Sequence, residues 1–169
     1  LFPDTYYFTP VATESDAFTQ LDKNFKRRAG PYEVESLVTG YSFHEILTMA
    51  SLLEEEAKTD EDRTMISSIL WNRIEEGMPL QVDAVFPYII GRNTYQVTKA
   101  DLANTSPYNT YVHKGLPPGP ISNPGLSSIR AAIHPAQSEY LFYLHDRYGT
   151  MHYARTFDEH VANRRKYLN

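Results

Sequence analysis

The stretch SFHEILTMASLLEEEAK (residues 42–58) predicts a helix with one apolar face. Ser42 and Glu45 form a capping box, in which each side chain bonds the other residue's backbone amide. Apolar residues then recur at the spacing of one helical face. They are Phe43, Ile46, Met49, Ala50 and Leu53. Because three consecutive glutamates follow, this apolar face runs directly into a cluster of carboxyl groups.

The three glutamates are expected to differ in exposure. At about 100° per residue, Glu55 lies opposite the apolar face, whereas Glu54 and Glu56 flank it. Burial and a nearby like charge both raise the pKa of a carboxyl group, which would leave an acid able to donate a proton near neutral pH. Helical spacing does not choose between Glu54 and Glu56. A solvated helix end without chemistry remains the plainer interpretation of the spacing alone.

Further helices and one β-hairpin are predicted around this helix. The helices cover residues 13–28, 60–76, 98–103, 126–134 and 157–168, and the strands cover residues 140–145 and 151–155. Gly30-Pro31 is expected to end the first helix. Residues 78–125 are rich in Pro, Gly, Asn and Tyr, and regular structure resumes after them. They therefore predict a long ordered loop of functional importance.

The fold class predicted is α+β, helix-rich, with a small β-hairpin and this long Pro/Gly/Asn-rich active-site loop. The chain has 169 residues, which suits a single domain over residues 1–169. The net charge is −5 and no basic patch stands out, which argues against a nucleic-acid partner. The 13 Tyr and 8 Phe are compatible with a sugar-binding groove.

Several kinds of site are poorly supported. The chain has no cysteine, which excludes disulfides, thiolate zinc sites and cysteine nucleophiles. The stretch HEILT begins like a zinc-protease motif, but Thr48 stands where the second histidine would be. No phosphate-binding loop occurs, and the lysines lie at helix ends or in polar loops, which disfavours a Schiff base. We therefore expect neither a metal nor a cofactor.

Six stretches, taken in order, resemble the endolytic murein transglycosylases, the YceG-like (MltG) family. They are FPDTYYF (2–8), TMASLLEEEA (48–57), NRIEEGMPLQVDA (72–84), SPYNTYVHKGLPPGPISNPG (106–125), AAIHPA (131–136) and HY…FDEHVANRRKY (152–167). Two positions depart from the family pattern. Glu55 stands where the family often has a base, and Ala84 stands where it often has proline.

The resemblance implies roles for particular residues. Glu56 falls at the catalytic glutamate of the family, and Glu54 matches a second, supporting acid. Gln81 is similar to a glutamine of the soluble lytic transglycosylases, and Tyr108 with Asn109 looks like their Ala-Tyr-Asn motif. The residues expected to bind substrate are Glu54, Gln81, Asp83, Ser106, Tyr108, Asn109, Tyr111 and Asn123. The alternative for Asn109 and Asn123 is that they only shape turns.

The reaction implied is cleavage of the MurNAc–GlcNAc β-1,4 bond within a glycan strand, without water. The C6 hydroxyl of the substrate attacks C1, so one glutamate suffices as acid and then base, whereas an ordinary glycosidase needs two carboxylates. One alternative is a hydrolase in which Asp83 or Glu54 activates a water. The other is a glycan-binding module without activity. An aminodeoxychorismate lyase is discounted, because no lysine has a suitable setting.

The expected partners are peptidoglycan glycan strands and, beyond them, the machinery of cell-wall synthesis. The expected location is outside the cytoplasm. No stretch approaches the ~20 apolar residues of a membrane span. Since the sequence starts at Leu1, we interpret it as a piece of a longer protein, anchored to the membrane only through a segment absent from this chain.

Overall fold

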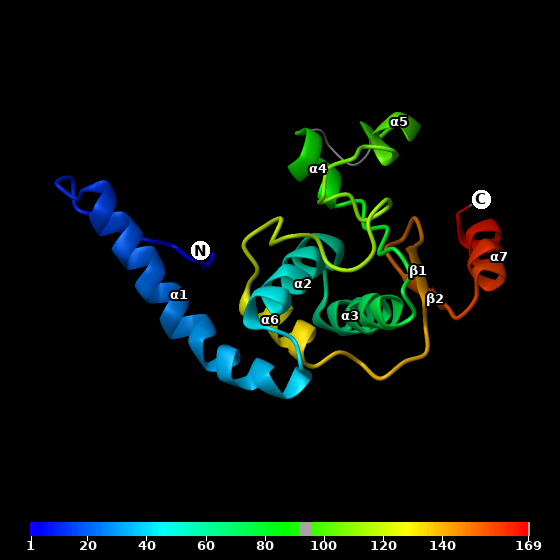
Figure 1. Cartoon of the computed structure of the whole chain (residues 1–169), viewed down its shortest axis with the longest axis horizontal. Coiled ribbons are helices and arrows are strands. Elements are labelled where there is room, and N and C mark those ends of the chain that lie inside the picture. Colours follow the sequence, from blue (N-terminus) through cyan, green and yellow to red (C-terminus); the bar gives the residue numbers. More distant parts are fainter. Residues whose placement is uncertain (92–95, 169) are drawn as a thin grey trace.

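A computed structural model describes residues 1–91 and 96–168 of the chain (Figure 1). The helices are α1 (Glu14–Ser36), the short 3-10 turn η1 (Leu37–Thr39), α2 (Phe43–Glu56), α3 (Asp60–Glu75), α4 (Val85–Ile90), α5 (Lys99–Leu102), α6 (Leu126–Ile133) and α7 (Phe157–Tyr167). The strands are β1 (Phe142–His145) and β2 (Met151–Ala154). The α+β class is confirmed. No helix within the described ranges is both long and apolar enough to cross a membrane.

Helix α2 forms as predicted, and the structure places it at the centre of the core. Its capping box is present, with the Ser42 side chain accepting from the Glu45 amide and the Glu45 carboxylate bonding the Ser42 amide. The apolar face is buried, and Ile46, Met49 and Leu53 are fully inaccessible. Helices α1, α3 and α6 all pack against α2, as Figure 1 shows around its centre. Burial of such a face is the main favourable contribution to folding.

The end of the chain folds over the hairpin. Strands β1 and β2 pair antiparallel, with Tyr143 opposite Tyr153. Helix α7 contacts both strands. Its Phe157 lies 6.0 Å from the ring of Phe142 on β1. The predicted hairpin and closing helix are therefore confirmed, and together they form one wall beside the ends of α2 and α3.

Helix α1 contradicts the prediction that Gly30-Pro31 ends it. The helix continues through Pro31 to Ser36. Proline removes one backbone hydrogen bond and usually breaks or kinks a helix. Here the turns around Pro31 pack on the core, since Ala29 is fully buried and Tyr32 contacts the core cluster. This burial offsets the lost bond, and Figure 1 shows the helix axis changing direction in its C-terminal part.

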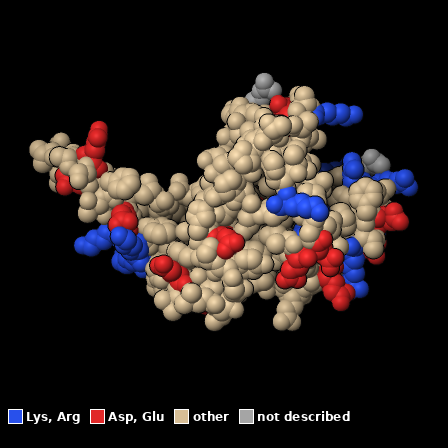
Figure 2. All heavy atoms as spheres, viewed as in Figure 1, with Lys and Arg blue, Asp and Glu red and all other residues tan. Residues whose placement is uncertain are grey.

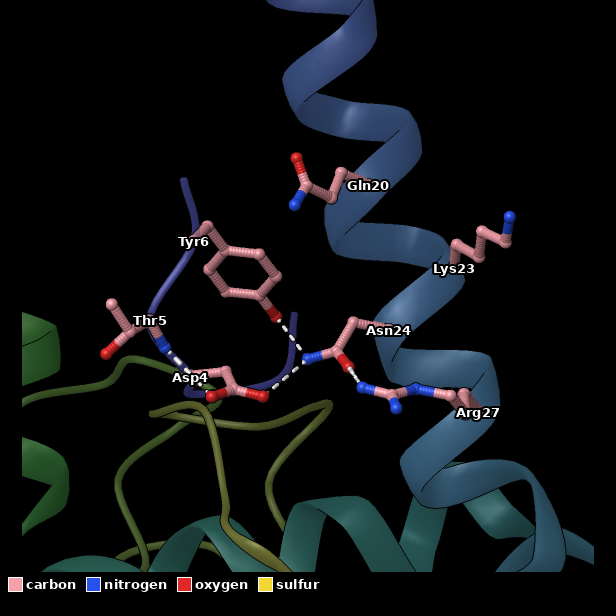
Figure 3. Close-up of a pocket in the computed structure, with 7 residues that line it drawn as sticks. All are labelled: Asp4, Thr5, Tyr6, Gln20, Lys23, Asn24 and Arg27. Carbon is pink, nitrogen blue, oxygen red and sulfur yellow. Dashed lines mark hydrogen bonds between the residues drawn. The ribbon is translucent and has the colours of Figure 1, made fainter. Parts of the chain in front are cut away.

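The N-terminal segment, residues 1–11, forms no helix or strand and lies along α1 (Figure 3). Asn24 on α1 holds it, because the Asn24 side-chain amide donates to Asp4 (3.1 Å) and to the Tyr6 hydroxyl (2.8 Å). Arg27 in turn donates to Asn24 at 2.6 Å. Figure 3 shows this network at the centre of a shallow pocket between the two segments. None of the predicted site residues lines that pocket.

The long loop is ordered where the structure describes it, although residues 92–95 of the predicted segment lie outside the described residues. It also contains helix α4, which was not predicted. Its Pro87 sits in the first turn, where the missing amide hydrogen costs nothing. The later part of the loop is attached to α2, because the Ile121 amide donates to Ser51 (3.0 Å) and Ser122 donates to the Ser51 carbonyl (3.1 Å).

Candidate active site

One pocket of about 440 Å³ lies where the end of α2, the last turn of α3, the turn at residues 81–83, the hairpin and α7 meet. Four residues singled out from the sequence line it: Glu56, Gln81, Asp83 and Tyr111. The other lining residues were not predicted and are Arg73, Phe142, Tyr143, Phe157, His160 and Arg164. The pocket therefore combines carboxyl groups, hydroxyls, aromatic rings and cations.

The three glutamates differ in exposure, and Glu55 is the exposed one, as the helical spacing predicts. Its side chain is exposed, whereas Glu54 and Glu56 are half-buried. Glu56 faces the pocket, and the Tyr143 hydroxyl donates to its Oε2 at 2.9 Å. The structure thus distinguishes two glutamates that the spacing could not.

The environment of Glu56 favours its neutral form. Burial is the largest cause that raises the pKa of this carboxyl group, and the charges of Asp83 and Glu55 act in the same direction. Hydrogen bonds from Tyr143 and from the backbone of Ala84 oppose them. The net effect is a pKa above the ordinary value of 4.5. Glu56 is therefore suited to donate a proton.

The turn at residues 81–83 presents two more polar groups. Gln81 has a positive φ of 53°, which is uncommon for a residue other than glycine. The turn is held by Thr110, whose carbonyl accepts from the Gln81 amide (3.0 Å) and whose hydroxyl accepts from the Val82 amide (3.0 Å). Strained backbone of this kind is often found at functional sites. In this turn the Gln81 side chain is exposed and lines the pocket.

Asp83 and Tyr111 form a pair in the same wall. The Tyr111 hydroxyl donates to Asp83 Oδ1 in a short hydrogen bond. Burial, followed by the bond to Asp83 and its charge, raises the pKa of Tyr111. Tyr111 therefore stays protonated and holds the Asp83 carboxylate in a fixed position.

Arg73 and Tyr143 line the candidate site but were not singled out from the sequence. Arg73 is only 6% exposed, and its guanidinium donates to the carbonyls of Leu141 (2.6 Å) and Leu80 (2.7 Å). Its carbon Cζ lies 5.1 Å from the centre of the Phe142 ring. Tyr143 is 87 residues from Glu56 in the sequence. No local sequence signal marks either residue, because the burial of Arg73 and the contact of Tyr143 with Glu56 both depend on distant segments of the chain.

Glu54 lies outside the pocket and joins α2 to α6. Its Oε2 accepts from the Gly125 amide (3.0 Å) and from the Ser128 hydroxyl (2.6 Å). Both groups belong to the start of α6, whose first turn has no side-chain cap of its own. The carboxylate therefore satisfies amide and hydroxyl groups at a helix N-terminus, where negative charge is favourable. A substrate-binding role for Glu54 stays a prediction.

Asn109 holds the long loop together through its side-chain amide. Asn109 is fully buried, donates to the carbonyls of Leu102 (3.0 Å) and Asn104 (2.7 Å), and accepts from the Tyr111 amide (3.0 Å). This geometry agrees with the alternative in which Asn109 shapes a turn. A substrate-binding role for Asn109 stays a prediction.

Ser106, Tyr108 and Asn123 also lie outside the pocket lining. Ser106 accepts from the Tyr108 amide at 3.3 Å, and Tyr108 packs on Tyr88 with 4.8 Å between ring centres. Asn123 accepts from the backbone nitrogen of Leu1 at 3.0 Å. Substrate binding by these three residues likewise remains untested.

Comparison with known proteins places the chain in a family. The YceG-like family matches residues 1–166. A Bacillus subtilis (strain 168) protein named endolytic murein transglycosylase is 40% identical over 170 residues, which cover 100% of this chain and 47% of that protein. A Streptococcus pneumoniae (serotype 2, strain D39) protein of the same name is 30% identical over 175 residues, covering 100% of this chain and 32% of that protein.

A solved structure agrees with these relatives. The crystal structure of a yceG-like protein from Listeria monocytogenes superposes with a TM-score of 0.86 at 38% identity, covering 96% of this chain and 53% of that one. The chain spans about half or less of the length of the curated relatives it matches. The resemblance seen in the six motifs is thereby confirmed. This chain belongs to the YceG-like family.

Proposed function

We propose that this chain cleaves peptidoglycan glycan strands as an endolytic lytic transglycosylase, with Glu56 as the catalytic residue. The observation that carries the proposal is the half-buried Glu56 carboxyl group, with a raised pKa, in a pocket large enough for sugar rings. The name of the curated relatives, endolytic murein transglycosylase, points to the same reaction. The residues 1–169 would form one catalytic domain.

The reaction needs one proton donor and no water. Neutral Glu56 gives its proton to the glycosidic oxygen as the bond from that oxygen to C1 of MurNAc breaks. The C6 hydroxyl oxygen of the same MurNAc forms a new bond to C1. Its proton passes to the Glu56 carboxylate, which restores the starting acid. The products are a 1,6-anhydro-MurNAc end and a strand that begins with GlcNAc.

The neighbours of Glu56 have supporting roles in this scheme. The Tyr143 hydroxyl orients the carboxyl group through its 2.9 Å bond. The Asp83 carboxylate, fixed by Tyr111, offers a negative charge that favours positive charge developing at C1. Gln81 is exposed in the same pocket and can bind an N-acetyl or hydroxyl group. These groups come from three segments of the chain, namely the hairpin with Tyr143, the turn at residues 81–83 and the loop that carries Tyr111.

A hydrolase is the second candidate, and it would use Asp83. Asp83 shares the pocket with Glu56, as a base that activates water would have to. Glu54 is less suited to that task, because its carboxylate is occupied by Gly125 and Ser128. The two reactions differ in the mass of the new strand end.

Mass spectrometry of the products tests the proposal. Purified glycan strands are incubated with the protein, and the new ends are weighed. Ends lighter by one water than reducing sugars would support the transglycosylase. Reducing ends, abolished in Asp83→Asn, would support the hydrolase and contradict the proposal.

Action on peptidoglycan places the protein outside the cytoplasm in this proposal. Glycan strands would be its substrate partner. Attachment to the membrane and contact with the wall-synthesis machinery are further parts of this proposal.

A further inference from the structure

A cluster of three basic side chains lines the active-site pocket beside its aromatic residues. We define the cationic cluster as the guanidinium groups of Arg73 and Arg164, with the imidazole of His160 beside them; all three side chains line the pocket that contains Glu56. The ring of Phe142 lies between two of these side chains: its centre is 5.1 Å from Arg73 Cζ and 5.4 Å from the centre of the His160 ring. The charges of Arg164 and Arg73 also act on His160, after burial, to lower its pKa.

No acidic side chain among the described residues forms an ion pair with either arginine, Arg73 or Arg164. Arg73 donates only to backbone carbonyls, and its Nη2 has no hydrogen-bond partner among those residues. A guanidinium group in a pocket wall that keeps a nitrogen without a hydrogen-bond partner can still bind an anion.

The pocket gathers positively charged side chains although the chain as a whole is acidic. The chain carries a net charge of −5, and Figure 2 shows acidic and basic side chains mixed over the visible face, with Lys and Arg around the end that carries α7. Inside the pocket, the guanidinium groups of Arg73 and Arg164 share the lining with the carboxyl groups of Glu56 and Asp83, and burial favours the neutral form of Glu56. A pocket of this kind attracts and orients anionic groups.

The charge of the substrate narrows the choice of anion. The alternating sugars of a glycan strand are uncharged, so their rings and N-acetyl groups give guanidinium groups no opposite charge to bind. The carboxylates of peptidoglycan lie on the peptide stem attached to the lactyl group of MurNAc. This is the sugar whose C1 must sit at Glu56 in the proposed reaction.

We propose that the cationic cluster binds a carboxylate of the peptide stem on the MurNAc residue that is cleaved, so that strands with free stem carboxylates are preferred. This inference rests on the proposed function and adds a specificity-determining site to it. Arg164 is exposed on α7, one helical turn after His160, whereas Arg73 is buried. The cluster therefore offers cations from the surface of the pocket to its interior.

A binding experiment tests the preference without turnover. Soluble glycan oligomers with peptide stems are prepared with free carboxylates and, as a matched set, with the carboxylates converted to amides. Their Kd values are measured by calorimetry on Glu56→Gln, alone and combined with Arg164→Gln. Arg165→Gln is the control, because Arg165 is exposed on the same helix and does not line the pocket.

The free-carboxylate oligomers should bind about three- to tenfold more tightly than the amidated ones, the range expected for a partly exposed charged hydrogen bond. Arg164→Gln should remove this difference, and Arg165→Gln should keep it. Equal Kd values for the two sets, no detectable binding, or a preference that survives Arg164→Gln would overturn the inference.

The masses of the products test the proposed function independently of the Kd values. The oligomers are weighed after each titration, and the unsubstituted protein is assayed on the same two sets. Anhydro ends from both sets with equal Kd values would mean that the function stands and the stem site does not. Cleavage by Glu56→Gln would count against the catalytic assignment alone.

Discussion

The hydroxyl of Tyr143 donates a 2.9 Å hydrogen bond to Oε2 of Glu56, joining the β-hairpin to the last residue of α2. A donated hydrogen bond stabilises the carboxylate and therefore lowers the pKa of Glu56 against the larger, opposite effect of burial. The hairpin thus limits how far burial raises this pKa. This relationship gives the pH dependence of the proposed reaction a defined sign.

Replacing Tyr143 by phenylalanine should extend activity to higher pH. Without the hydroxyl, the neutral form of Glu56 persists to a higher pH, because the pKa rises further. The alkaline limb of the pH profile of kcat/KM, which reports groups of the free enzyme, should move to higher pH. Tyr153→Phe is the matched control, since Tyr153 lies opposite Tyr143 on β2 and, in the part of the chain that the structure describes, forms no hydrogen bond to Glu56. A limb that moves downward, or equally in both variants, would refute this assignment of Tyr143.

Asp83→Asn should move the same limb in the opposite direction. The negative charge of Asp83 raises the pKa of Glu56, so its removal lowers that pKa. Activity that needs neutral Glu56 should then be lost at a lower pH than in the unsubstituted protein. The pH profile of kcat/KM checks this, and an unchanged or upward shift would show that Asp83 does not act on Glu56 in this way.

Glu56→Gln should stabilise the fold at neutral and alkaline pH. The folded-state pKa of Glu56 is raised above its ordinary value of 4.5, so between these two values the folded chain binds a proton that the unfolded chain has lost. Stability therefore falls as pH rises through that window, and glutamine removes the loss. Each 1 kcal/mol gained should raise Tm by about 2–4 °C.

Thermal unfolding at pH 4.5 and pH 8 measures the effect. The gain in Tm should be present at pH 8 and shrink toward pH 4.5, where Glu56 is neutral in the folded state. A gain in Tm of equal size at both pH values would mean that burial does not raise the pKa of Glu56.

Glu54→Ala should destabilise the junction of α2 with α6. The substitution leaves the Gly125 amide and the Ser128 hydroxyl without their acceptor, and Ser128 is fully buried. The expected cost is about 1–3 kcal/mol in the free energy of unfolding. Glu55→Ala is the control, because Glu55 is the exposed neighbour on the same helix. Urea unfolding compares the two, and equal midpoints would contradict the anchoring role of Glu54.

Much of the fold could be predicted because its signals are local. The capping box at Ser42 and Glu45, the apolar face of α2 and the hairpin each depend on residues close together in sequence. Helix α1 was predicted too short because packing of Ala29 and Tyr32 on the core outweighs the local effect of Pro31.

The candidate site could be predicted only in part. Glu56, Gln81, Asp83 and Tyr111 lie in recognisable motifs, and they share one pocket. Tyr143 and Arg73 depend on contacts between distant segments, such as the bond from Arg73 to Leu141, 68 residues away. Helical spacing also could not show that Glu54 turns toward α6 while Glu56 faces the pocket.

The most direct test of the central claim is the rate at which anhydro ends form with Glu56→Gln and with Glu55→Gln. Both variants remove one carboxylate from the same helix end, but only Glu56 faces the pocket. General acid catalysis contributes about 10²–10⁴-fold, so Glu56→Gln should retain less than about one hundredth of the unsubstituted rate, and Glu55→Gln should stay within about twofold. A Glu56→Gln variant that keeps more than about one hundredth of the rate would contradict the claim that Glu56 is the acid.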